Sequence, residues 1–321
     1  MYRIGVDLGG TNIAVGLVDE NHKIAYKRSI PTGASREAEA VLADIAALCR
    51  SVCAEAGIAL SDIEAIGVAT PGAANSEMGV VAYANNLPFR NFPMAKALSE
   101  QLDGKKVYIE NDANAAALGE AVAGAAKGVK NSVMITLGTG VGGGIVIGGK
   151  VYAGFNYAGG ELGHMVIEHG GQPCTCGRRG CWEAYSSATA LIRMTEEKIE
   201  ECEAQGRETL LGKYLSKDGK VTGRTAFDAM RAGDVVAKEV VDTYLSYLVT
   251  GLTNIINIFQ PEVISLGGGV SGEGQSLIDA LVPEVRAQRY GGDRFEGTEL
   301  RIAELKNDAG IIGAACLGMN A

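Results

Sequence analysis

The sequence predicts an α/β protein in which one domain is duplicated around a cleft. Segments with strand and helix patterns alternate along the chain, as expected for a layered α/β architecture. The length of 321 residues suits two domains. A strand, a Gly/Thr tip and a second strand also occur twice, at residues 2–18 and again at residues 132–147. This repeat favours two related halves.

The first predicted elements are a hairpin and a helix. Residues 2–7 and 13–18 have the pattern of two strands, and Gly9 and Gly10 form the turn between them. Apolar residues then recur at helical spacing, with Ser35 as the expected N-cap and Gly57 as the expected C-cap.

The rest of the chain continues this alternation. Strands are expected at residues 63–69, 107–110, 132–137, 145–147, 263–266 and 300–303. Helices are expected at residues 113–123, 235–259 and 309–317, in a region that Glu183 opens, and in a segment that ends near Arg286. The helix at residues 235–259 is largely apolar, so we expect it to run through a core or a subunit contact.

Four side chains that ligate metals lie close together in the sequence. They follow the spacing H-x9-C-x-C-x4-C and are His164, Cys174, Cys176 and Cys181. Three sulfurs and one imidazole are the ligand set of a closed tetrahedral zinc site. Glu161 and Glu183 bracket the cluster. We therefore expect structural zinc beside a polar pocket for a small, hydroxyl-rich molecule.

Free thiols and disulfides are the alternatives to a metal. The seven cysteines are an odd number, and the N-terminus MYRIGVDLGG lacks the pattern of a secretory signal. A reducing cytoplasm is therefore expected, where clustered cysteines more often bind metal. The remaining cysteines are expected to be core or surface residues: Cys49, Cys53, Cys202 and Cys316.

Composition and charge argue against two classes of partner. The formal net charge of -9 opposes a phosphate backbone, so nucleic-acid binding is disfavoured. No apolar run approaches the ~20 residues that span a bilayer, so no membrane partner is expected.

Clustered glycines indicate loops where the backbone approaches a ligand closely. The two Gly/Thr tips and a third glycine loop at residues 267–274 present backbone N–H groups that suit phosphate oxygens. The pattern of a P-loop is absent from the sequence. Matches to G-x-G-x-x-G begin at Gly138 and Gly267, but the acid expected about twenty residues later is not evident. A dinucleotide site is therefore the weaker alternative.

Two acids lie where chemistry is expected. Asp112 follows a predicted strand and precedes a predicted helix, so it is either an N-cap or a general base facing a cleft. The sequence pattern leaves both roles open. Asp7 lies at the first Gly/Thr tip and is suited to holding a metal ion beside polyphosphate.

At these residues the chain resembles the ROK family of sugar kinases and repressors, within the actin-like ATPase superfamily. The motifs span essentially the whole chain: DLGGTN (7–12), ATPG (69–72), ENDANAAALGE (110–120), LGTGVGGG (137–144), ELGH (161–164), CTCGRRGCWE (174–183) and LGGGVSG (266–272). Among members of the family, they are most similar to bacterial glucokinases. The resemblance implies a two-domain actin-like ATPase (ribonuclease H-like) fold with a cleft between duplicated domains.

The same resemblance implies ATP-dependent phosphorylation of the glucose 6-hydroxyl, with Mg²⁺ and with Asp112 as general base, in cytoplasmic glycolysis. The nucleotide residues would be Asp7, Gly9, Gly10, Thr11, Asn12, Gly138, Thr139, Gly140, Gly268 and Gly269. The sugar residues would be Pro71, Gly72, Asn86, Asn111, Asp112, Glu161, His164 and Glu183. Residues 85–89 depart from the family's usual Pro-Asn-Leu-x-Trp, so the detail of that wall is not carried over.

The resemblance also sets the expected domains and the rival functions. A small domain at residues 1–111, joined by the C-terminal helix at 304–321, would precede a large domain at 112–303 with the zinc loop at 164–181. A homo-oligomer, dimer or tetramer, is expected. The rivals are kinases for N-acetylmannosamine, N-acetylglucosamine or fructose, and a non-catalytic sugar sensor. Repressors of the family carry a DNA-binding motif before the first strand, which here begins at residue 2.

Overall fold

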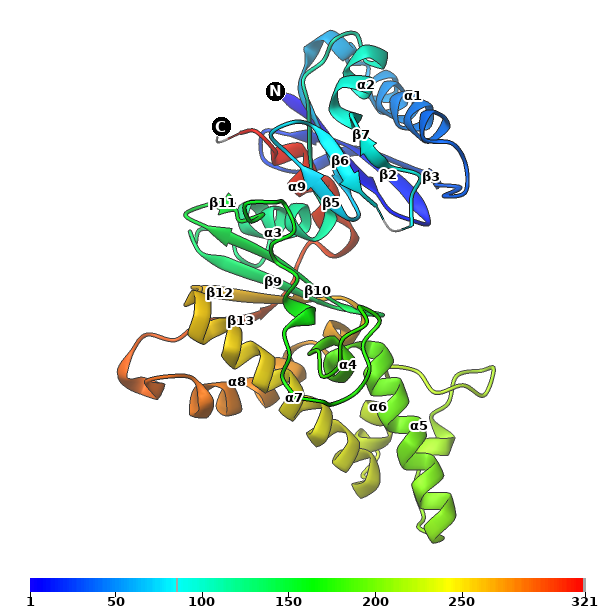
Figure 1. Ribbon diagram of the computed structural model, residues 1–321, viewed down its shortest axis with the longest axis vertical. Coiled ribbons are helices and arrows are strands. Elements are labelled where there is room, and N and C mark those ends of the chain that lie inside the picture. Colours follow the sequence, from blue (N-terminus) through cyan, green and yellow to red (C-terminus); the bar gives the residue numbers. More distant parts are fainter. Residues whose placement is uncertain (85, 320–321) are drawn as a thin grey trace. The chain divides into compact units, whose positions relative to one another are not determined.

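The computed structural model describes residues 1–84 and 86–319 (Figure 1). Contacts divide the chain into two compact units. The first comprises Met1–Met134, Gly143–Gly160 and Ala303–Ala321, and the second comprises Ile135–Gly142 and Glu161–Ile302. The predicted domain boundary between residues 111 and 112 stays a prediction, although the helix that begins at Asp112 is grouped here with the first unit.

Two five-stranded sheets repeat one topology. The first has the order β3-β2-β1-β4-β8 and consists of β1 (Tyr2–Leu8), β2 (Asn12–Asp19), β3 (Ile24–Pro31), β4 (Ile63–Thr70) and β8 (Val107–Asn111). The second has the order β11-β10-β9-β12-β13 and consists of β9 (Ser132–Leu137), β10 (Val141–Ile147), β11 (Lys150–Val151), β12 (Val263–Gly267) and β13 (Glu299–Ile302). In both sheets the strands, counted along the chain, follow the order third, second, first, fourth, fifth. The predicted duplication is confirmed.

Helices complete the α/β layers. They are α1 (Ala38–Ala56), α2 (Met94–Gln101), α3 (Asp112–Ala123), α4 (Glu183–Ser186), α5 (Ala188–Gln205), α6 (Thr225–Arg231), α7 (Val235–Phe259), α8 (Gln275–Gln288) and α9 (Ala309–Cys316). A small antiparallel sheet contains β5 (Ala73–Asn75), β6 (Val80–Tyr83) and β7 (Arg90–Phe92). Within the described residues, none of the helices has the length and apolar character needed to cross a membrane.

In the first unit, the alternation of β1 decides which helix covers each face. Ile4, Val6 and Leu8 belong to the core that contains the apolar face of α1. Glycines on the opposite face allow α9 to approach closely, since a Cβ at Gly5 would lie 1.9 Å from a backbone oxygen of α9. Asp7 points to this same face by alternation, and a Cβ at Gly310 in α9 would lie 3.0 Å from its carboxylate.

In the second unit, α7 provides a notch for the only tryptophan. Trp182 is fully buried, and its Nε1 donates to the carbonyl oxygen of Tyr247 at 2.9 Å. A Cβ at Gly251 would lie 2.0 Å from the Trp182 ring, so the notch requires glycine. The contact anchors α4 to α7, whose bounds agree with the prediction.

The structure corrects the predicted start of the first helix. The helix α1 begins at Ala38 with Glu37 as N-cap, so Ser35 is not the cap, whereas Gly57 is the left-handed C-cap at φ 66°. Sequence patterns also missed β3, β5 to β7, β11, α2 and α6, whereas α4 and α5 lie in the helical region that Glu183 was expected to open. Most side chains of β3 are exposed, so this strand lacks the apolar alternation that marks half-buried strands.

Candidate active site and metal centre

The first Gly/Thr tip joins β1 to β2 and is fixed by a residue that sequence analysis missed. Thr32 is fully buried, and its backbone N–H donates to Thr11 O at 2.8 Å. Its hydroxyl donates to Gly9 O at 2.6 Å. The structure also brings two predicted residues together, because a Cβ at Gly10 would lie 3.8 Å from the Cβ of Asn86. No local pattern marks Thr32, since its partners lie more than twenty residues away.

Asp7 is the second-last residue of β1, next to this tip, and its carboxyl group has a perturbed pKa. Burial, reinforced by the charge of Asp112, raises the pKa of Asp7 to about 6, although Lys27 opposes the shift. Two carboxylates therefore repel each other within the first unit. Hard oxygen donors of this kind suit Mg²⁺, so Asp7 fits the predicted role of holding that ion.

Asp112 was expected to be either the N-cap of the helix or a general base, and the structure shows that another residue is the N-cap. Asn111 is the N-cap of α3: its Oδ1 accepts from the backbone N–H groups of Ala113 at 2.9 Å and Asn114 at 3.1 Å. Asp112 is the first helical residue, and its Oδ1 accepts from the N–H of Ala113 at 2.8 Å. Burial raises the pKa of Asp112. Since Asn111 caps the helix, the Asp112 carboxylate is not required for that purpose.

The buried side chain of Glu110 stabilises the turn between β8 and α3. Glu110 accepts from the backbone N–H of Asn111 at 2.9 Å and from Nδ2 of Asn114 at 3.1 Å. Burial raises the pKa of Glu110. Both side chains are nearly inaccessible to solvent, so together they fix the turn that presents Asp112. Glu110 and Asn114 both belong to the ENDAN motif, but the sequence did not reveal that they stabilise this turn.

The predicted sugar-side loops of the first unit are close to Asn111. Its Nδ2 donates to Gly72 O at 3.0 Å. Gly72 has φ 87°, and a Cβ there would lie 2.0 Å from Tyr83 O, so only glycine fits beside Pro71. Arg90 donates to Phe89 O at 2.9 Å and to Ala84 O, which braces the loop that carries Asn86. Residue 85 of this wall lies outside the described residues.

The second Gly/Thr tip joins β9 to β10 and is tightly held. The N–H of Gly138 donates to Gly140 O at 3.0 Å, and the Thr189 hydroxyl donates to Thr139 O at 2.8 Å. Gly268 has φ 82°, and a Cβ there would lie 2.6 Å from the backbone of Leu137. The second unit thus brings together the tip and the loop of Gly268 and Gly269.

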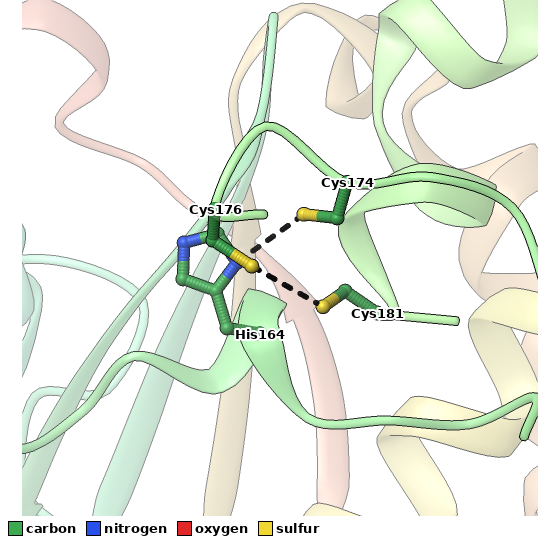
Figure 2. A group of neighbouring side chains, drawn as sticks. All are labelled: His164, Cys174, Cys176 and Cys181. Carbon is green, nitrogen blue, oxygen red and sulfur yellow. Dashed lines mark hydrogen bonds between the residues drawn. The ribbon is translucent and has the colours of Figure 1, made fainter. Parts of the chain in front are cut away.

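The four predicted metal ligands converge (Figure 2). Their ligand atoms all lie within 4.8 Å of one another. His164 Nδ1 is 3.6 Å from Cys174 Sγ, and Cys176 Sγ is 3.6 Å from Cys181 Sγ. Tetrahedral zinc places two sulfurs about 3.8 Å apart and sulfur and nitrogen about 3.6 Å apart. The donor set and its spacing therefore fit zinc.

Two of the predicted sugar contacts flank the metal cluster. The helical turn Leu162–His164 is closed by the His164 N–H, which donates to Glu161 O at 3.0 Å. Because His164 Nδ1 faces the cysteines, Nε2 is the nitrogen left for another partner. Glu183 accepts from the Val141 N–H at 3.0 Å and from the Thr175 hydroxyl at 3.1 Å. Glu183 thus contacts both the second tip and the segment of the metal ligands, while Glu161 lies beside His164 in the same unit.

Comparisons with known proteins agree over nearly the full length. The profile described as "ROK family" matches residues 3–320. A glucokinase of Halalkalibacterium halodurans is 39% identical over 98% of this chain and 94% of its own length. A ROK hexokinase from Thermus thermophilus has a TM-score of 0.79 at 36% identity, covering 98% of this chain and 97% of that one. A ROK glucokinase from Streptomyces griseus, solved with glucose and AMPPNP, has a TM-score of 0.78 at 34% identity and covers 100% of both chains. The chain belongs to the ROK family and has its duplicated actin-like ATPase fold.

Proposed function

We propose that this protein is an ATP-dependent glucokinase that phosphorylates the 6-hydroxyl of glucose. The main observation behind the proposal is that Asn111, and not Asp112, is the N-cap of α3. Asn111 caps α3, which leaves a partly buried carboxylate with a raised pKa at the end of β8. The choice of glucose and ATP as substrates rests on the similarity of the chain to glucokinases, one of which was solved with glucose and AMPPNP.

Asp112 acts as the general base in this proposal. Its carboxylate takes the proton of the 6-hydroxyl as that oxygen attacks the γ-phosphorus of ATP. Proton transfer of this kind is typically worth about 10²–10⁴ in rate. The hydrogen bonds of Glu110 and Asn111 hold the turn that orients this carboxylate. Positioning by the surrounding backbone supplies most of the remaining rate enhancement.

The two Gly/Thr tips are proposed to bind the phosphates of ATP. Gly9, Gly10, Thr11 and Asn12 form the first tip, Gly138, Thr139 and Gly140 form the second, and Gly268 and Gly269 lie on the adenosine side. Asp7 would hold Mg²⁺, directly or through water, and the ion neutralises phosphate charge when bound. The raised pKa of Asp7 fits this role, because a cation favours the ionised carboxylate.

The proposed sugar contacts are Pro71, Gly72, Asn86, Asn111, Asp112, Glu161, His164 and Glu183. His164 would ligate zinc through Nδ1 and contact a sugar hydroxyl through Nε2. Zinc, held by His164 and the three cysteines, is structural: it fixes the loop that carries these contacts. Clustered metal-ligating cysteines favour a cytoplasmic location.

A coupled assay of ADP formation tests the proposal. The panel contains glucose, mannose, fructose, N-acetylglucosamine and N-acetylmannosamine, each at saturating MgATP. We expect the highest kcat/KM for glucose, with glucose 6-phosphate as the product. A higher kcat/KM for another hexose would transfer the function to that substrate. Sugar binding without turnover would identify the protein as a sensor.

A further inference from the structure

Two carbonyl groups and one N–H group of the second tip form hydrogen bonds with one short segment. We call residues 138–141 the tip segment and residues 183–189 the anchor segment. The Ala188 N–H donates to Gly138 O at 2.8 Å, and the Thr189 hydroxyl donates to Thr139 O at 2.8 Å. At the other end, the Val141 N–H donates to Glu183 Oε2 at 3.0 Å. The anchor segment therefore determines the backbone position of the tip segment.

The anchor segment is also joined to the metal loop, which we define as residues 172–181. Thr175 lies between two of the predicted metal ligands, and its hydroxyl donates to Glu183 Oε1 at 3.1 Å. The sulfur of Cys174 lies 3.7 Å from the same oxygen. One carboxylate thus contacts the metal loop through Oε1 and the tip segment through Oε2.

Between Thr139 and the metal loop, no close side-chain packing among the described residues takes the place of the hydrogen bonds made by Glu183. A cavity of about 400 Å³ lies between the metal loop and the tip segment, and its lining includes Thr139, Thr175 and Glu183. Glycine at position 140 permits the approach of the carboxylate, because a Cβ there would lie 2.3 Å from Glu183 Oε2. The backbone of the tip is therefore shaped to receive this side chain.

We propose that Thr175 and Glu183 are positioning residues for the nucleotide phosphates. The metal loop orients Thr175, the hydroxyl of Thr175 orients the Glu183 carboxylate, and the carboxylate fixes Val141 and with it the tip segment. The metal loop then tunes the nucleotide site as well as the sugar site. The inference rests on the proposed function, which assigns the tip segment to the phosphates of ATP.

The test is Thr175→Val in the zinc-loaded protein, with Thr175→Ser as the conservative variant. Thr175 is exposed and its side chain is not among the metal ligands, so zinc content and folding should be unchanged. Affinities for MgAMPPNP and for glucose are measured separately by calorimetry. We expect Thr175→Val to raise the Kd of MgAMPPNP about three- to tenfold, the range for one lost hydrogen bond. Because Glu183 is also a proposed sugar contact, the Kd of glucose should rise too. The deciding readout is therefore the Kd of MgAMPPNP measured without sugar, which Thr175→Ser should restore.

Thr243→Val is the matched control, because the Thr243 hydroxyl donates only to a carbonyl of its own helix. It should leave both affinities unchanged. The inference is wrong if Thr175→Val binds MgAMPPNP within twofold of the wild type, or if Thr175→Ser does not restore the nucleotide affinity. In either case the proposed function stands as long as the wild type binds both ligands. A wild-type protein that does not bind MgAMPPNP would overturn both proposals.

Discussion

Asn111 connects two predicted sugar-side segments, since its Nδ2 donates to the carbonyl oxygen of Gly72 at 3.0 Å. The Oδ1 of the same side chain caps α3. One amide therefore fixes the turn after β4 and the start of the helix that carries Asp112. This arrangement separates the stability of the turn from its chemistry, and the two can be tested with different substitutions.

Asp112→Asn should lower kcat by about 10²–10⁴, because an amide cannot accept the proton of the attacking hydroxyl. The melting temperature should not fall, since Asn111 retains the cap. Asn111→Ala is the contrasting variant and should cost about 0.5–2 kcal/mol of stability through loss of the cap. Steady-state kinetics and thermal unfolding check both statements. An Asp112→Asn enzyme that keeps most of its kcat would exclude the general-base role.

The pH dependence of kcat/KM should reflect raised carboxyl pKa values in the free enzyme. Burial raises the pKa of Asp112, and Asp7 reaches a pKa of about 6. A raised carboxyl pKa means that the ionised form is lost at a higher pH than for a free aspartate, near 3.9. Activity should therefore fall as the pH drops through about 6. A profile between pH 5 and 9 that is flat on the acid side would contradict this expectation.

Asp7→Asn should stabilise the ligand-free protein at neutral pH while weakening MgATP binding. Because the folded pKa lies above the unfolded value, the ionised carboxylate destabilises the fold above pH 6, by up to about 3 kcal/mol. As the pH falls toward 4, the folded wild type takes up the proton and recovers this stability. The difference between variant and wild type should thus be larger at pH 7.5 than at pH 5, as measured by urea unfolding. A gap that widens on acidification would have the wrong sign.

Purified protein should contain close to one zinc ion per chain, since the four ligand atoms lie within 4.8 Å of one another and form a zinc ligand set. Cys176→Ser should lose most of this zinc and weaken glucose binding, because in the proposed site the metal leaves Nε2 of His164 for the sugar. Metal analysis and glucose titration measure the two effects. Cys202→Ser, which changes a buried cysteine outside the cluster, is the control and should retain zinc. Zinc-free wild-type protein with full glucose affinity would refute the metal site.

Glu120 belongs to the ENDANAAALGE motif but has a structural role. Its fully buried carboxylate accepts from the backbone N–H groups of Ala125, Glu304 and Leu305 at 2.7, 3.1 and 2.8 Å. Glu120→Gln replaces one acceptor oxygen with a donor and should cost about 1.5–3 kcal/mol. The KM values of the folded variant should remain within twofold of the wild type. A large change in KM without loss of stability would point to a role in the site instead.

Sequence patterns identified those parts of the site whose signal is local. The metal ligands lie within eighteen residues, and their chemistry and spacing alone predicted the cluster that the structure forms. The two Gly/Thr tips repeat one local pattern, and this repeat predicted the duplicated sheets. The long helix α7 was predicted with its observed bounds, because its apolar residues recur over many turns.

Only the tertiary structure decided which residues hold these parts in place. Thr32 fixes a tip that is more than twenty residues away, and Gly251 provides the notch for Trp182. Asn111 and Asp112 are adjacent in the sequence, yet only hydrogen-bond geometry shows which one caps α3. Likewise, the sequence suggested Glu183 as a sugar contact but not its links to Thr175 and Val141. Hydrogen-bond geometry and close backbone approach depend on distances in three dimensions, many of them between segments far apart in the chain, and a linear pattern does not encode those distances.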